Sequence, residues 1–221
     1  MPAFKLKISE LYGEVSCEVS HTPSAKYILM LAHGAGAGMD HSFLQKISQA
    51  LTELHAVVVR FNFPYKEQGK KFPGSVKPNI MTIRSLSIWC GENYPNLPLF
   101  LAGKSYGGRM ISHFIAEDKQ NDVRGLIYFG FPLHAAGKPD TKRADHLHKI
   151  KIPQLFLQGT NDALADFELI RKVTANLPLA TLIPITNADH SFKIPKKEKG
   201  KSPDEVIDYL AGLAIKWITS S

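Results

Sequence analysis

The chain has 221 residues, of which 44% are hydrophobic and 21% are charged. This length and apolar content are enough for a sizeable buried core, which excludes an intrinsically disordered chain. The 16 glycines, 14 prolines and 2 cysteines exclude collagen-like and disulfide-stapled proteins. The formal net charge of +7 fits a mildly basic enzyme and also fits a protein with an anionic partner.

Neither the cysteines nor the apolar runs indicate a secreted or membrane protein. Cys17 and Cys90 match no metal-ligand or redox spacing, so we expect two reduced thiols in the core. No apolar run approaches the roughly 18 residues of a membrane span. Residues 1–10 alternate apolar and polar side chains and lack the apolar block of a signal peptide. We therefore expect a cytoplasmic location.

Short apolar segments alternate with longer segments of helical periodicity. Two strands are expected first, over residues 4–8 and 14–19, with Gly13 in the turn between them. The continuous apolar run 27–32 predicts a strand that is covered on both faces. The elements expected next are, in chain order, a helix over 42–54, a strand over 57–61, a helix over 79–93, a strand over 97–102, a helix over 105–117, strands over 125–131 and 153–158, a helix over 167–176, a strand over 180–185 and a helix over 203–217.

This alternation predicts an α/β fold with parallel β-α-β units and a doubly wound sheet. The two leading strands, which have no helix between them, predict an antiparallel N-terminal edge. The chain shows no internal repeat and no low-complexity linker, so we expect a single domain over residues 1–221. Only about twenty residues separate the strands that end at Phe131 and begin at Pro153.

The segment Gly103-Lys104-Ser105-Tyr106-Gly107 matches the pattern G-x-S-x-G between a predicted strand and a predicted helix. A serine on such a sharp turn is held in a strained conformation with its hydroxyl clear of the sheet, and the flanking glycines avoid collisions. The alternative is a glycine-rich turn with a bystander serine. A phosphate-binding P-loop is disfavoured because Pro98 occupies the position of its first glycine.

A second glycine-rich segment, residues 33–38, directly follows the strand predicted over 27–32. Small residues let backbone amides approach a substrate oxygen closely, so this segment resembles half of an oxyanion hole. Ala35 would supply one N–H, and Tyr106 would supply the other. The dinucleotide-binding pattern G-x-G-x-x-G fails here in both frames, and an ordinary tight turn remains the alternative.

Asp162 and His190 follow the predicted strands 153–158 and 180–185. The order Ser105, Asp162, His190 is that of α/β-hydrolases, and all three follow the carboxyl ends of predicted parallel strands. Asp166 is the second candidate for the acid. Asp189 is disfavoured because adjacent side chains diverge.

Five segments, LAHGAGAGMD, GKSYGGRM, FGFPLH, QGTND and ADHSF, occur in the order found in α/β-hydrolases. The whole chain resembles that superfamily, in particular the branch with testis-expressed protein 30, the hydrolase-like domain of subunit 3 of the NSL histone-acetyltransferase complex, and small bacterial relatives of dienelactone hydrolases. The resemblance implies the α/β-hydrolase fold. Members of this superfamily usually carry a lid between the strands that here end at Phe131 and begin at Pro153, so the short spacing predicts a minimal lid. It also implies Ser105 as nucleophile, His190 as base, Asp162 as acid, and Ala35 and Tyr106 as oxyanion donors.

Several basic residues surround these candidates. His134, His146 and His148 could bind a metal, but their lysine and arginine neighbours favour a solvated face. Arg109, one helical turn after Ser105, could orient an acidic group of a substrate or form a surface ion pair. The basic run over 193–201 could favour anionic substrates, although a solvated loop is the simpler interpretation. It lacks aromatic residues between its lysines, so it does not indicate nucleic-acid binding.

Together these patterns predict a serine esterase or thioesterase that acts on a small acyl substrate without a metal or organic cofactor. A non-catalytic binding module or complex subunit of the same fold is the alternative, because some members of the branch serve as subunits. An acyltransferase would use the same residues. The sequence indicates neither the substrate nor the oligomeric state.

Overall fold

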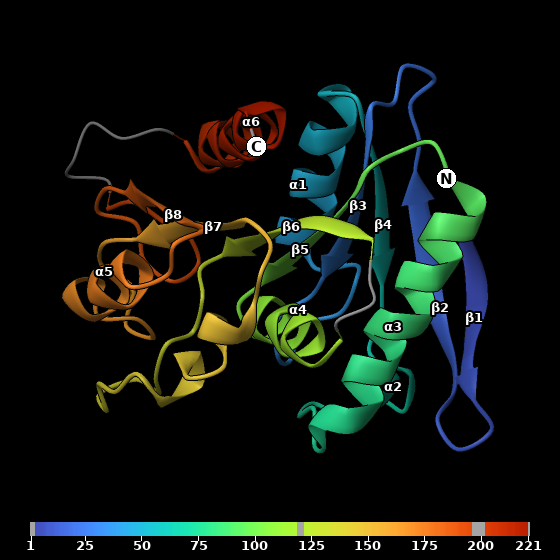
Figure 1. Ribbon diagram of the computed structural model, residues 1–221, viewed down its shortest axis with the longest axis horizontal. Helices are drawn as coiled ribbons and strands as arrows, with labels where there is room; N and C mark the ends of the chain where they lie inside the picture. The colour runs from blue at the N-terminus through green and yellow to red at the C-terminus, as the bar shows by residue number, and fades with distance from the viewer. Residues whose placement is uncertain (1–2, 119–121, 196–201, 221) are drawn as a thin grey trace.

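The computed structural model describes residues 3–118, 122–195 and 202–220. Its sheet has eight strands in the order β1-β2-β4-β3-β5-β6-β7-β8 (Figure 1). The strands are β1 (Ala3–Ser9), β2 (Gly13–Ser20), β3 (Tyr27–Ala32), β4 (Ala56–Phe61), β5 (Leu99–Lys104), β6 (Val123–Phe129), β7 (Gln154–Gly159) and β8 (Ala180–Ile185). The helices are α1 (Ser42–Glu53), α2 (Pro64–Glu67), α3 (Val76–Asn93), α4 (Tyr106–Glu117), α5 (Phe167–Ala175) and α6 (Pro203–Ser220).

The predicted α/β-hydrolase topology is confirmed. Strands β4, β3, β5, β6, β7 and β8 are parallel to one another. Strands β1 and β2 form the predicted antiparallel edge, and β2 pairs antiparallel with β4. Strands β1 and β8 are the two outer strands of the sheet.

Helices cover both faces of the sheet and divide its apolar side chains into two clusters. Helices α1 and α6 lie side by side on one face, and α3, α4 and α5 cover the other (Figure 1). Within β3, Ile28 and Met30 belong to the α3–α5 cluster, whereas Leu29 and Leu31 belong to the α1–α6 cluster. Successive side chains of a strand point to opposite faces, so a strand covered on both sides is continuously apolar.

Some element boundaries differ from the prediction. Strand β5 was expected over 97–102 but spans Leu99–Lys104, because Gly103 and Lys104 pair with the end of β6. Helix α3 begins at Val76, three residues before the expected start, because a proline such as Pro78 is tolerated in the first turn of a helix. The four-residue helix α2 was not expected, since it is too short to show a helical period.

The chain between β6 and β7 forms no large lid. Its regular structure consists of two 3₁₀ turns, η1 (Lys142–Ala144) and η2 (Leu147–Lys149), and of one isolated bridge between Ala135 and Lys138. This agrees with the minimal lid expected from the twenty-residue spacing. Cys17 and Cys90 are buried free thiols, as expected. Among the described residues, no helix is both long enough and apolar enough to cross a membrane.

The turn from β5 into α4 depends on two glycines that pack against backbone. A Cβ atom on Gly103 would lie 2.4 Å from the backbone nitrogen of Gly108. A Cβ atom on Gly107 would lie 2.5 Å from the carbonyl oxygen of Ala32. Real Cβ atoms do not approach backbone this closely, so only glycine fits at either position without movement of the main chain.

We therefore expect Gly103→Ala to lower the free energy of unfolding by about 1–3 kcal/mol, the usual cost of overpacking. The matched control is Gly212→Ala within α6, where an added Cβ has no neighbour within 4 Å. That control should raise the free energy of unfolding by up to about 1 kcal/mol, because alanine favours a helix interior. Urea unfolding measures both. Equal stability of the two variants would contradict the close packing at this turn.

Candidate active site

The structure brings together Ser105, Asp162 and His190, which follow β5, β7 and β8 at one edge of the sheet. His190 Nε2 lies 2.8 Å from Ser105 Oγ, and His190 Nδ1 lies 2.7 Å from Asp162 Oδ2. The Asp162 side chain is fully buried, and that of His190 is 22% exposed. The three side chains thus form a continuous series of hydrogen bonds that ends at a partly exposed serine.

Ser105 has the backbone conformation predicted for the turn. Its φ is +52°, a region that residues other than glycine rarely adopt. Ser105 N donates to Phe129 O at 3.2 Å, and Ser105 O accepts from Arg109 N at 3.1 Å, which starts α4. The Ser105 side chain makes no capping bond to the helix. Backbone bonds and glycine packing therefore hold a strained conformation that leaves the hydroxyl for His190.

The Asp162 carboxylate is fixed by three hydrogen bonds. Its Oδ1 accepts from Leu164 N at 2.7 Å, and its Oδ2 accepts from Gln158 Nε2 at 2.7 Å and from His190. A carboxylate at Nδ1 can only accept, so Nδ1 carries the imidazole proton and Nε2 is left to accept from the Ser105 hydroxyl. This is the tautomer that a general base needs.

Gln158 supports the Asp162 carboxylate, a role that was not predicted from the sequence. Its Oε1 accepts from Phe131 N at 2.9 Å while its Nε2 holds Asp162, so the end of β6 is tied to the loop after β7. The signal was a glutamine near the end of a strand in which every residue is buried. A buried polar side chain of this kind requires partners.

The glycine-rich segment 33–38 lies against the serine, as predicted. A Cβ atom on Gly34 would be 3.7 Å from Ser105 Cβ. Ala35, the next residue, is exposed, and Tyr106 is the first residue of α4, so its N–H has no acceptor within the helix. The Tyr106 amide is therefore next to Ser105 in the chain, and the Ala35 amide belongs to a segment that lies near Ser105 in space. Their role as oxyanion donors stays a prediction.

His33 orders this segment and does not serve as a base. Its Nε2 accepts from Phe63 N at 3.1 Å, and its Nδ1 donates to Gly34 O at 2.8 Å. Burial lowers the pKa of His33 to about 4, so the imidazole is neutral at physiological pH.

The alternative acids have other partners. Asp166 Oδ1 accepts from Leu169 N at 3.0 Å and caps α5. Asp189 Oδ1 accepts from Ser191 N and Lys193 N and shapes the turn after His190. Asp162 alone of the three candidate acids contacts the histidine.

The expectation of a solvated histidine face is wrong for His134 and partly wrong for His146. His134 is buried, and its Nε2 accepts from Asp166 N at 2.7 Å. His146 is half-buried and stacks on His113 with ring centroids 3.7 Å apart. His148 is exposed, as expected. Within the described ranges, no group of three or more side chains could hold a metal ion.

Lys104 was not predicted to take part in the site, although it occupies the first variable position of G-x-S-x-G. Its Nζ donates to His190 O at 2.6 Å. Burial lowers the pKa of Lys104 to about 8, and the carboxylates of Asp162 and Asp189 oppose this shift. The basic run begins at Lys193, but its other lysines, Lys196, Lys197, Lys199 and Lys201, lie outside the described residues.

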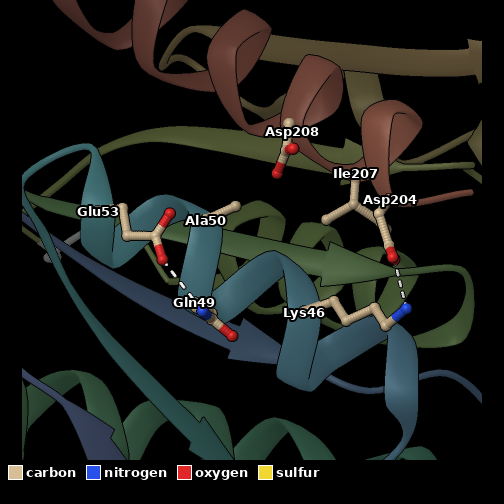
Figure 2. A pocket seen from close by; sticks show the side chains of 7 residues that line it. All are labelled: Lys46, Gln49, Ala50, Glu53, Asp204, Ile207 and Asp208. Carbon is tan, nitrogen blue, oxygen red and sulfur yellow. Dashed lines mark hydrogen bonds and ion pairs between the residues drawn. The ribbon is translucent and has the colours of Figure 1, made fainter. Parts of the chain in front are cut away.

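A hollow between α1 and α6 is separate from this arrangement (Figure 2). Lys46 and Asp204 form an ion pair across it, and Gln49 donates to Glu53 along α1 at 3.0 Å. All its lining residues come from these two helices, and none follows the carboxyl end of a strand. The hollow therefore contributes nothing to the candidate site.

Solved structures similar to this chain have the same fold. A serine hydrolase homologue from Coxiella burnetii matches with a TM-score of 0.75 and 18% identity over 97% of this chain and 96% of the other. A serine hydrolase without a lid from Xanthomonas campestris matches with a TM-score of 0.72 and 21% identity over 98% and 94%. Dienelactone hydrolase from Anabaena variabilis matches with a TM-score of 0.75 and 16% identity over 99% and 97%.

A family model described as an alpha/beta hydrolase domain matches residues 25–219. The match begins just before β3 and runs into the last turn of α6, so it includes every strand that carries a candidate residue. The narrower branch named from the five sequence segments stays a prediction. The extent of the match shows that this chain belongs to the alpha/beta hydrolase domain family.

Proposed function

We propose that the chain is a serine hydrolase that cleaves an ester or thioester through a covalent acyl-enzyme. The observation that carries this proposal is the unbroken series of hydrogen bonds from Asp162 through His190 to Ser105. The family match supports hydrolase chemistry. Several neighbours of the same fold are named as serine hydrolases or esterases.

Two other Ser–His contacts show by comparison which features set the Ser105–His190 pair apart. Ser24 Oγ lies 2.6 Å from His55 Nδ1, and Ser112 Oγ lies 2.7 Å from His146 Nε2. Among the described residues, neither histidine has a carboxylate partner, and neither serine stands at a strand-to-helix turn. A histidine without an orienting acid is a poorer base, because neither its tautomer nor its charged form is stabilised.

The reaction follows from these contacts. Ser105 Oγ attacks the acyl carbon while its proton passes to His190 Nε2, and Asp162 stabilises the resulting imidazolium. Amides of Ala35 and Tyr106 hold the oxyanion. The alcohol or thiol leaves with the proton from His190. Water, deprotonated by His190, then attacks the acyl carbon, which releases the carboxylic acid and restores the serine.

The substrate that we propose carries an acidic group, which Arg109 and Arg143 would bind. The Arg109 guanidinium lies 5.7 Å from the centre of the ring of Tyr106, the residue that follows the nucleophile Ser105. Burial and the nearby Arg143 both lower the pKa of Arg109. Within the described residues, neither arginine is paired with a carboxylate, and Arg109 Nε is buried without a hydrogen-bond partner. An anionic group of the substrate would offset the burial of the Arg109 charge and its repulsion by Arg143.

The absence of a large lid between β6 and β7 supports a small or solvent-accessible acyl group. The neighbour from Xanthomonas campestris is also described as lacking a lid. The chain would need no metal or organic cofactor for this chemistry, since a nucleophile, a base, an acid and two amide donors suffice.

We expect a fluorophosphonate probe to add once to the wild-type chain and not to Ser105→Ala, as measured by intact mass. The matched control is Ser24→Ala, which removes the serine of an exposed Ser–His pair and should be labelled like wild type. Hydrolysis of short p-nitrophenyl esters by Ser105→Ala should fall by about 10⁶-fold at constant fold. A folded wild type that is not labelled would favour the non-catalytic binding module.

Arg109→Gln should raise KM for an ester that carries a carboxylate by about 10-fold, the loss of one charged hydrogen bond. KM for a neutral ester of the same size should not change. The matched control is Arg124→Gln, which removes the same charge from an exposed position on β6. Equal rises in KM for both esters, or an equal effect of the control, would contradict the proposed anion site.

A further inference from the structure

Lys104 connects the strand of the nucleophile to the loop of the base. It is the last residue of β5, next to Ser105, and its ammonium group donates to the main-chain oxygen of His190 at 2.6 Å. The two residues are 86 positions apart in the chain. This bond therefore restrains the His190 backbone relative to the strand that carries the serine.

The ammonium group lies in an environment with few alternative partners. It stands 5.2 Å from the centre of the Phe192 ring and 5.9 Å from that of Phe43, which are cation–π distances. A Cβ atom on Gly130 would be 3.2 Å from Lys104 Nζ and 3.6 Å from His190 Nδ1. The lysine nitrogen and the imidazole thus adjoin the same point of the main chain.

The charged and titratable groups that face this ammonium come from two loops. Asp162 follows β7, and Asp189 and His190 follow β8. The aromatic contact from α1 is uncharged. The positive charge therefore lies near both the carboxylate of the acid and the imidazole of the base.

Burial of an ammonium group is costly, and a neutral donor could hold a carbonyl oxygen without that cost. The cost is visible in the lowered pKa of Lys104, about 8. The nearby carboxylates of Asp162 and Asp189 oppose this shift, so at neutral pH the side chain remains a charged donor. A charge-assisted hydrogen bond holds the His190 carbonyl oxygen more firmly than a neutral donor would.

We propose that Lys104 is a positioning residue of the Ser105–His190 pair, which holds the His190 main chain in place relative to β5. This inference rests on the proposed hydrolase function. It assigns a role to the first variable position of G-x-S-x-G, which the triad mechanism does not use.

The test compares wild type with Lys104→Met, which keeps an unbranched side chain and removes the donor and the charge. The rate of fluorophosphonate labelling should fall by about 10- to 100-fold at neutral pH, the effect of a misplaced catalytic group. The kcat for a short p-nitrophenyl ester should fall by the same factor with KM unchanged, because the substrate still binds. The control is Lys46→Met, which removes a surface lysine of α1 and should change neither quantity.

A second measurement does not depend on activity. The pKa of Lys104 in the folded chain, about 8, is below its ordinary value of 10.5. Between these values the unfolded chain binds more protons, so the stability of wild type rises with pH. The free energy of unfolding of wild type, measured relative to Lys104→Met, should therefore increase from pH 8 to about 10.5 and stay constant below pH 8.

The outcomes separate the two proposals. If wild type is not labelled, the hydrolase function fails, and the role of Lys104 fails with it. If wild type is labelled and Lys104→Met matches it in labelling rate and in kcat, only the Lys104 proposal is overturned. A variant with an unchanged kcat and a raised KM would also overturn the positioning role.

Discussion

Direct backbone packing where β5 turns into α4 is the constraint on which the site depends. Gly103 and Gly107 have no room for a side chain, because the main chain of the helix and of β3 lies where a Cβ atom would stand. This contact forces the chain to reverse within a few residues, which places Ser105 at the left-handed φ of +52°. The contact between Ser105 and His190 depends on a serine that is positioned in this way.

The same constraint recurs on the opposite side of the site. A Cβ atom on Gly159, at the end of β7, would lie 2.3 Å from the carbonyl oxygen of Ala188. Main-chain packing therefore brings the loop of Asp162 against the loop of His190, independently of their catalytic side chains. Hydrogen bonds from Gln158 and Lys104 then fix what the backbone has brought close. The geometry of the candidate site thus depends both on main-chain packing and on buried hydrogen bonds.

The fold and the three central residues could be predicted because they depend on local patterns. A continuous apolar strand such as β3 indicates cover on both faces, and a glycine-flanked serine between strand and helix indicates one sharp turn. The carboxyl ends of parallel strands share one edge of the sheet, so Asp162 and His190 were expected near Ser105.

The remaining features depend on tertiary contacts that have no local period. The support from Gln158 joins the ends of two strands, and the bond from Lys104 reaches across 86 residues. His134 is buried by the loop after β7, although its basic neighbours in sequence suggested a solvated face. The positive charges of Arg109 and Arg143, which lack a carboxylate partner in the described part of the chain, also come from separate elements. Such pairings become visible only when the chain is folded.

The outer strands of the sheet bear on how this protein avoids aggregation. An open sheet has two edges whose unpaired backbone groups can recruit another chain. Strand β1 presents the exposed side chains of Lys5 and Lys7, which oppose the approach of a further strand. Strand β8 contains Pro184, whose ring removes one N–H from that edge. Both edges are thus poor templates for strand addition, which protects a sheet that no barrel closure seals.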